Sequence, residues 1–165
     1  MLLKQHTETT IRNTTASAIW EFAYDPTNWT ASNPQEHRSL VFHTKEDRPA
    51  TGVTFEQKEY VAGIYAVLRG QVLYAKRPEI CVWTGVAAYK LFCLTIHIPE
   101  GGTALLTEST EGIVLSHDVY MDFPDSLFGK IAWWYFTSIR KGEQAVFDHT
   151  QRELDYFKNQ LELND

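Results

Sequence analysis

Roughly the last forty residues constrain the fold most, because they form one long amphipathic segment. From about Pro124 onward nothing predicts the end of a helix, and apolar side chains recur at steps of three and four residues. As one helix, residues 130–163 would span roughly 50 Å, with bends expected at Gly129 and Gly142. The apolar stripe needs a concave surface to cover, and it consists of Phe136, Ile139, Val146, Phe147, Leu154, Phe157 and Leu161.

The preceding residues predict the sheet that this helix covers. Alternation over 5–12 predicts a strand, and helical spacing predicts short helices over 16–24 and 27–31, capped by Thr14 or Thr15 and by Asp25-Pro26. Turn residues then delimit six further strands with short antiparallel connections. These strands are expected over 37–44, 51–61, 64–75, 79–86, 88–98 and 103–114, with turns at 47–49, 62–63, 77–78 and 99–102.

The predicted fold class is α+β. It is a curved antiparallel seven-stranded sheet wrapped around a long C-terminal helix, with two short helices between the first two strands. No repeat or flexible linker divides the sequence, so we expect a single domain over residues 1–165. A helix across a curved sheet rarely fills the concavity, and this architecture therefore favours an internal cavity.

Composition narrows the class of partner. Fifteen basic and 21 acidic residues give a net charge of −6, which disfavours nucleic acid. Apolar runs are too short for stable membrane insertion, and no leader sequence is recognised, so we expect a cytoplasmic protein. Cys81 and Cys93 are expected as free thiols, with a bridge across a hairpin as the alternative.

Four segments together resemble the START/Bet v 1-like (SRPBCC) superfamily, which includes bacterial polyketide cyclases and dehydrases. They are residues 19–29 (IWEFAYDPTNW), 51–55 (TGVTF), 101–103 (GGT) and 154–162 (LDYFKNQLE). The resemblance covers nearly the whole chain and implies a helix-grip fold with a cavity for lipophilic molecules. It also implies that Trp29 roofs the cavity mouth, although a plug between helix and sheet explains the same residue.

The strand over 53–61 supplies candidate site residues. Alternation puts Phe55, Gln57, Glu59 and Val61 on one face, and the resemblance turns that face toward the cavity. Glu59 would then be a catalytic candidate, whereas on an edge strand its carboxylate would be solvated. Val61 stands near the place where aromatase-like relatives carry an arginine.

Glu143 interrupts the apolar stripe of the last helix and is the second catalytic candidate, for proton transfer, if it faces the cavity. The alternative places it at the flank of the helix, in water. The ligand is further expected to contact Phe92, Leu94, Thr107, Val146 and Thr150. Thr150 could equally be a core residue that bonds back to its own helix.

The histidines do not show metal-ligand spacing, so we expect neither a structural metal nor a cofactor. His117-Asp118 is expected in the loop before the last helix, either as an acid/base group or as an exposed pair. Phosphate-loop and nucleophile-elbow motifs are absent from the sequence.

Three functions remain open. The first is a protein that binds a hydrophobic, aromatic or polyketide-like small molecule. The second is a cofactor-independent cyclase, aromatase or dehydratase that uses cavity carboxylates to move protons. The third is an interaction module, for which the rings at 133–136 are the evidence, because four consecutive rings surround a helix. At least one of them then needs another partner, such as the loop at 117–125 or a second subunit in a homodimer.

Overall fold

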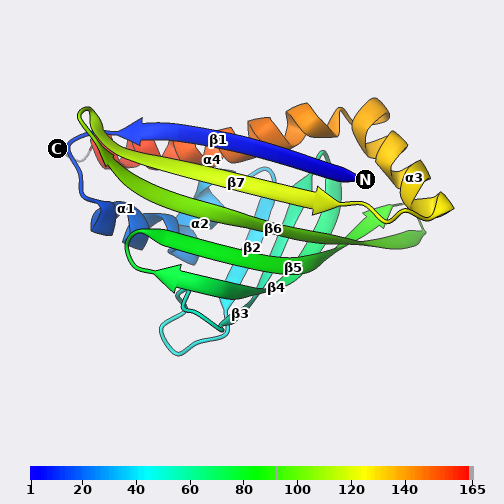
Figure 1. Ribbon diagram of the computed structural model, residues 1–165, viewed down its shortest axis with the longest axis horizontal. Coiled ribbons are helices and arrows are strands. Elements are labelled where there is room, and N and C mark those ends of the chain that lie inside the picture. Colours follow the sequence, from blue (N-terminus) through cyan, green and yellow to red (C-terminus); the bar gives the residue numbers. More distant parts are fainter. Residues whose placement is uncertain (92, 164–165) are drawn as a thin grey trace.

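A curved sheet of seven antiparallel strands forms most of the molecule, with α4 lying across one face (Figure 1). The computed structural model describes residues 1–91 and 93–163. The strand order across the sheet is β1-β7-β6-β5-β4-β3-β2, so the two edges come from the first two strands of the chain. The strands are β1 (Leu2–Ile11), β2 (His37–Phe42), β3 (Thr54–Val61), β4 (Ile64–Lys76), β5 (Ile80–Leu91), β6 (Leu94–Ser109) and β7 (Gly112–Asp122).

Two short helices, α1 (Ala16–Ala23) and α2 (Pro26–Ser32), connect β1 to β2 at the end of the molecule opposite α3 (Figure 1). Their boundaries follow from local capping. The Thr15 side chain accepts a hydrogen bond from the Ala18 amide, and Asp25 accepts from the amides of Thr27 and Asn28. Both predicted caps are therefore confirmed, and Pro26 occupies the first turn of α2, where a missing N–H costs nothing.

The C-terminal helix is interrupted, so the prediction of one helix over 130–163 is wrong. It consists of α3 (Leu127–Trp134), the π-helical turn η1 (Tyr135–Ile139) and α4 (Gly142–Glu162). Lys141 adopts a left-handed conformation with φ of 50° and ends the first part. Gly142 follows because a Cβ there would lie 2.1 Å from the Phe136 ring. The bend expected at Gly142 is thus a complete break.

The boundaries of the last three strands also differ from the prediction. Pro99 and Gly101-Gly102 lie inside β6, not in a turn, and β7 covers residues expected in a loop. Pro99 is tolerated because it pairs with Val86 of β5, while pairing with β7 starts only at Glu100. The glycines permit close packing, since a Cβ on Gly101 would lie 2.5 Å from the Tyr120 ring.

The core lies between the sheet and α4, where the apolar stripe meets the inward side chains of the strands. Val146, Leu154 and Phe157 are buried as predicted. Ile139 is 54% exposed, because it belongs to η1, before the break, and not to α4. Among the described residues, no helix has the length and apolar character needed to cross a membrane. Cys81 is buried and Cys93 is exposed, and both are free thiols.

Candidate functional site

A cavity of about 160 Å³ lies between the sheet, α1, α2 and α4. Its wall is mostly apolar and rich in aromatic rings, including those of Trp20, Trp29, Phe42, Phe55 and Trp83. Phe55 packs against Phe42 and Trp83 with ring centroids 5.9 Å apart in each pair. The curvature of the sheet leaves this volume because α4 cannot follow the concave surface along its whole length.

Most of the predicted site residues lie at the cavity wall. They are Trp29, Phe55, Gln57, Glu59, Val61, Val146 and Thr150. On β3 the alternation therefore has the register that the sequence indicates. The Thr150 hydroxyl donates to the Val146 carbonyl, as expected for a core threonine.

Two expected ligand contacts, Leu94 and Thr107, are wrong, and Glu143 takes the solvent-exposed alternative. Glu143 is exposed in the first turn of α4. The helix breaks at Lys141, so the apolar periodicity of the residues before the break does not continue into α4. Leu94 is exposed because it begins β6 at the hairpin end, where it pairs with Leu91, and Thr107 is exposed because it alternates with the buried Leu106. Phe92 lies outside the described residues.

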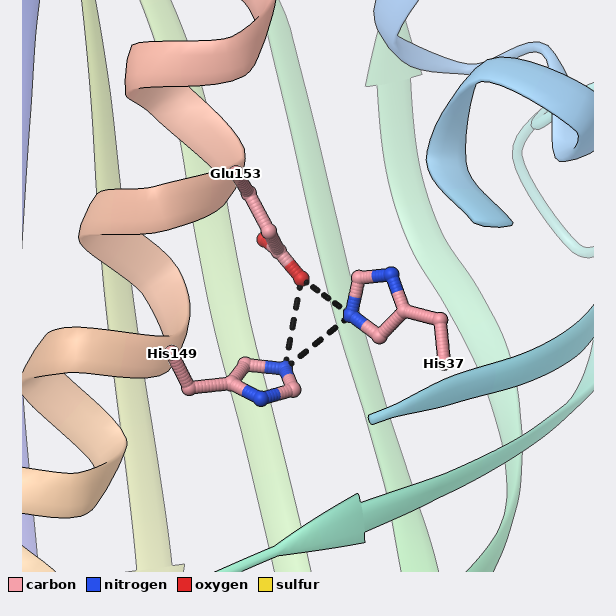
Figure 2. Close-up of side chains that lie close together, drawn as sticks. All are labelled: His37, His149 and Glu153. Atoms are coloured by element: carbon pink, nitrogen blue, oxygen red, sulfur yellow. Dashed lines mark hydrogen bonds and ion pairs between the residues drawn. The ribbon is translucent and has the colours of Figure 1, made fainter. Parts of the chain in front are cut away.

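A buried polar cluster is the main feature that the sequence reading missed. Figure 2 shows His149 and Glu153 from α4 pointing toward His37 from β2. Nε2 of His37 lies 2.8 Å from Oε1 of Glu153 and 3.2 Å from Nε2 of His149. Nε2 of His149 is 3.3 Å from the same Glu153 oxygen. All three residues are buried.

A β-bulge places His37 in this cluster. The pairing of β2 with β3 shifts between His37 and Ser39, so that His37, Leu40 and Phe42 all face inward. Simple alternation would have put His37 on the opposite face from Leu40. The imidazole stacks on Trp29 with centroids 3.6 Å apart, and its Nδ1 lies 2.6 Å from the Trp29 carbonyl oxygen. Trp29 thus holds the ring that reaches α4.

His149 and Glu153 are one helical turn apart on the inward line of α4. The buried positions of this helix include Val146, His149, Thr150, Glu153 and Leu154, which follow steps of three and four residues. Two charged or titratable residues on an apolar line were therefore visible in the sequence. The signal was available at His149 and Glu153, rather than at Glu143.

Glu59 approaches the cluster from β3. Its Oε2 lies 3.1 Å from Nε2 of His149 and 3.9 Å from Nε2 of His37. This buried oxygen makes no hydrogen bond of acceptable geometry, whereas Oε1 accepts one of 2.7 Å from Gln57. One carboxylate oxygen therefore points at the cluster without a directed donor.

Comparison with solved structures identifies the architecture. The crystal structure of Ara h 8.0201 matches 100% of both chains with a TM-score of 0.63 and 9% identity. A START superfamily protein from Mycobacterium smegmatis matches 97% of this chain and 98% of its own, with a TM-score of 0.60 and 13% identity. The chain has a START/Bet v 1-like helix-grip fold.

The di-domain ARO/CYC StfQ from the steffimycin biosynthetic pathway shares this fold with a TM-score of 0.63 and 14% identity. The match covers 99% of this chain and 52% of that one. Neither a protein-family model nor a curated protein matches the sequence. At these identities the similarity establishes the helix-grip fold alone.

Within the helix-grip cavity, the cluster is strongly charged. Burial disfavours an ionised Glu153, but hydrogen bonds from His149 and His37 outweigh it and hold the pKa of Glu153 well below its usual value. Burial likewise opposes a charged His149, yet hydrogen bonds to Glu153 and Glu36 and the nearby charge of Glu59 raise the pKa of His149 well above normal. At neutral pH the cluster therefore contains an imidazolium held among carboxylates.

Glu100 contributes a second buried acid to the cavity wall. Burial raises the pKa of Glu100 to about 8, although the Tyr89 hydroxyl donates a 2.7 Å hydrogen bond to its carboxylate. The charge of Glu59 raises it further, while His149 lowers it. Glu100 is consequently a neutral acid at pH 7, which is the form that a general acid requires.

Two of the histidines, His37 and His149, meet in space although their spacing in the sequence does not indicate it. Donor atoms of His37, His149 and Glu153 lie within 4.8 Å of one another, and these residues are able to hold a metal ion. His117 lies in β7 at the cavity wall, not in an exposed loop, and burial lowers its pKa. The helix-grip cavity thus combines an apolar wall with basic and acidic groups.

Proposed function

We propose that this protein binds a compact, ring-bearing hydrophobic molecule in the cavity between the sheet and α4. The observation that carries the proposal is the internal cavity of about 160 Å³ with its largely aromatic wall. An engineered apolar cavity of about 150 Å³ in another protein binds benzene, so this volume suits a ligand of one or two rings. Glu59, Glu100 and His149 at the wall would pair with a polar group on the ligand and orient it.

A second candidate is a cofactor-independent enzyme that rearranges such a ligand, as a cyclase or dehydratase would. Glu100 favours this candidate, because it is a buried acid with a pKa of about 8 that lines the same cavity as the basic His117. The helix-grip fold is shared with an ARO/CYC protein of a biosynthetic pathway. In the enzyme, Glu100 would donate a proton, and Glu59 is the second catalytic candidate.

Binding is tested by titration with the neutral two-ring fluorescent probe 1-aminonaphthalene, with tryptophan quenching as the second readout. Ala104 lines the cavity, so Ala104→Phe adds a ring to the empty volume and should weaken binding at least ~10-fold. Phe128→Ser is the matched control, because Phe128 is 69% exposed on α3 and its loss should leave the affinity unchanged.

The opposite pattern, with binding lost in Phe128→Ser and retained in Ala104→Phe, would place the probe on the surface and refute the cavity proposal. Mass spectrometry of the small molecules that co-purify with the protein then separates the two candidates. A carrier retains one compound unchanged, whereas an enzyme converts it, and Glu100→Gln should abolish the conversion while only altering affinity in a carrier.

A further inference from the structure

Four potential metal-binding atoms of the buried cluster, from His37, His149, Glu153 and Glu59, lie close together, and hydrogen bonds fix which nitrogen of each histidine faces the others. Nδ1 of His37 faces the Trp29 carbonyl oxygen at 2.6 Å, and a carbonyl can only accept. The Ser32 hydroxyl donates to the same carbonyl. The Nδ1 atom of His37 therefore carries a proton, and Nε2 is the ring nitrogen that faces Glu153 and His149.

The second imidazole is oriented in the same way. Nδ1 of His149 lies 2.9 Å from Oε2 of Glu36, and that carboxylate also accepts from Asn33 at 2.6 Å and from Arg152 at 3.2 Å. Glu36 thus accepts from Nδ1 of His149, which leaves Nε2 as the inward nitrogen, and a metal ion that binds there displaces the Nε2 proton.

Two carboxylate oxygens complete the set. Oε1 of Glu153 and Oε2 of Glu59 approach the same two nitrogens, and the five measured separations among the four atoms are between 2.8 and 3.9 Å. Four ligands placed tetrahedrally about 2.0–2.2 Å from a zinc ion are about 3.3–3.5 Å apart. These separations bracket that spacing, and the donors of His37, His149 and Glu153 all lie within 4.8 Å of one another, which suits a small divalent ion with the nearby Oε2 of Glu59 as the fourth ligand.

We propose that His37, His149, Glu153 and Glu59 bind a divalent first-row transition metal ion such as Zn²⁺. Imidazole and carboxylate donors together suit such ions. The Trp29 carbonyl and the Glu36 carboxylate act as the outer partners that fix the tautomer and orientation of each histidine. The unbonded Oε2 atom of Glu59 obtains its partner from the metal.

The bound ion would join α4 to β2 and β3 at the cavity wall, because the four ligands come from these three elements. It would cross-link α4 to β2, which is the edge strand on the opposite side of the sheet from β1. This site goes beyond ligand binding and does not depend on it. Metal binding is measured without any organic ligand, so the two proposals can fail separately.

The test starts with chelator-treated full-length protein titrated with Zn²⁺ by calorimetry, with the melting temperature as the second readout. One ion per chain should bind, and the melting temperature should rise with metal concentration because the ion binds only the folded state. Glu59→Gln removes one donor but keeps the side-chain shape, and it should weaken binding at least ~10-fold. Circular dichroism establishes that this variant is folded.

His6→Gln is the matched control. His6 lies on the surface 2.7 Å from Asp118 and 3.5 Å from Glu8, so it resembles the buried cluster in composition but not in burial. Its replacement should leave the affinity for Zn²⁺ unchanged. Binding that is lost in His6→Gln and retained in Glu59→Gln would be adventitious surface binding and would overturn the proposal.

A crystal of the unmodified protein soaked in Zn²⁺ gives a readout that needs no variant. The anomalous difference map at the zinc edge should show its peak between His37 and His149. A map with no peak there, or a titration without one-to-one binding, would mean that protons alone fill the cluster and that its role is confined to charge pairing.

Discussion

Helices α3 and α4 depart from the usual distribution of polar and apolar residues in opposite directions. α3 exposes large apolar side chains, because Leu127, Phe128, Ile131 and Trp134 are 52–72% exposed. α4 instead buries His149 and Glu153, which point at His37 (Figure 2). Exposed apolar patches mark contact surfaces, whereas buried charges survive only when they are paired.

The difference separates two kinds of unusual residue. The polar groups of α4 have partners on β2 and β3, so their burial is balanced inside the chain and each is coupled to its neighbours. Phe128 and Trp134 are exposed on α3, which lies at the end of the molecule away from α1 and α2 (Figure 1). Substitutions of the buried polar residues of α4 should therefore be costly, and substitutions on the exposed face of α3 should not.

The largest effect is expected for Glu153→Gln in the metal-free protein. The change removes the charge that pairs with His37 and His149, and it should lower the free energy of unfolding by about 2–4 kcal/mol at pH 7. Urea denaturation after chelator treatment measures it. Glu143→Gln is the matched control on the exposed side of the same helix, and it should change stability by about 0.5 kcal/mol or less. Equal effects at the two positions would remove the distinction between the faces of α4.

A smaller effect of opposite sign is expected for Glu100→Gln. The folded-state pKa of about 8 exceeds the unfolded value of 4.5, so the folded protein binds more protons than the unfolded chain between these values. Stability therefore falls as pH rises through that window. Gln is neutral at every pH and still accepts the Tyr89 hydrogen bond, so it should stabilise by about 2–3 kcal/mol at pH 7.

Denaturation curves of the wild type and Glu100→Gln at several pH values check this sign. The two proteins should have nearly equal stability below pH 4, where both side chains are neutral. The residues that act on Glu100 are Tyr89, Glu59 and His149. Destabilisation by Glu100→Gln at neutral pH would show that the buried carboxylate is charged and paired, and that its burial is balanced in the same way as that of Glu153.

The smallest effect is expected on α3. Phe128→Ser replaces a ring that is 69% exposed, so the free energy of unfolding should change by about 0.5 kcal/mol or less. Thermal denaturation compares it with the wild type, and sedimentation shows whether self-association changes. A loss of several kcal/mol would mean that the exposed face of α3 is part of the core, and the contrast with α4 would fail.

Local signals in the sequence determined much of the fold. The Thr15 and Asp25 caps, the two short helices and the alternation of β3 depend on residues within a few positions of one another, so they could be read before the structure was known. The same alternation placed Phe55 and Glu59 at the cavity wall. The seven antiparallel strands followed from short connections, although the boundaries of the last three did not.

Tertiary structure alone decided the boundaries and the cluster. Pro99 and Gly101 lie within β6 because of the strands beside them, not because of their own conformational preferences. His37 reaches the interior through a bulge that reverses the alternation, and it meets His149, 112 residues later in the chain. The periodicity of a sequence indicates which side chains share a face, because it reflects local geometry. It does not specify which distant face those side chains will meet. A site built from β2, β3 and α4 therefore exists only after those elements pack together.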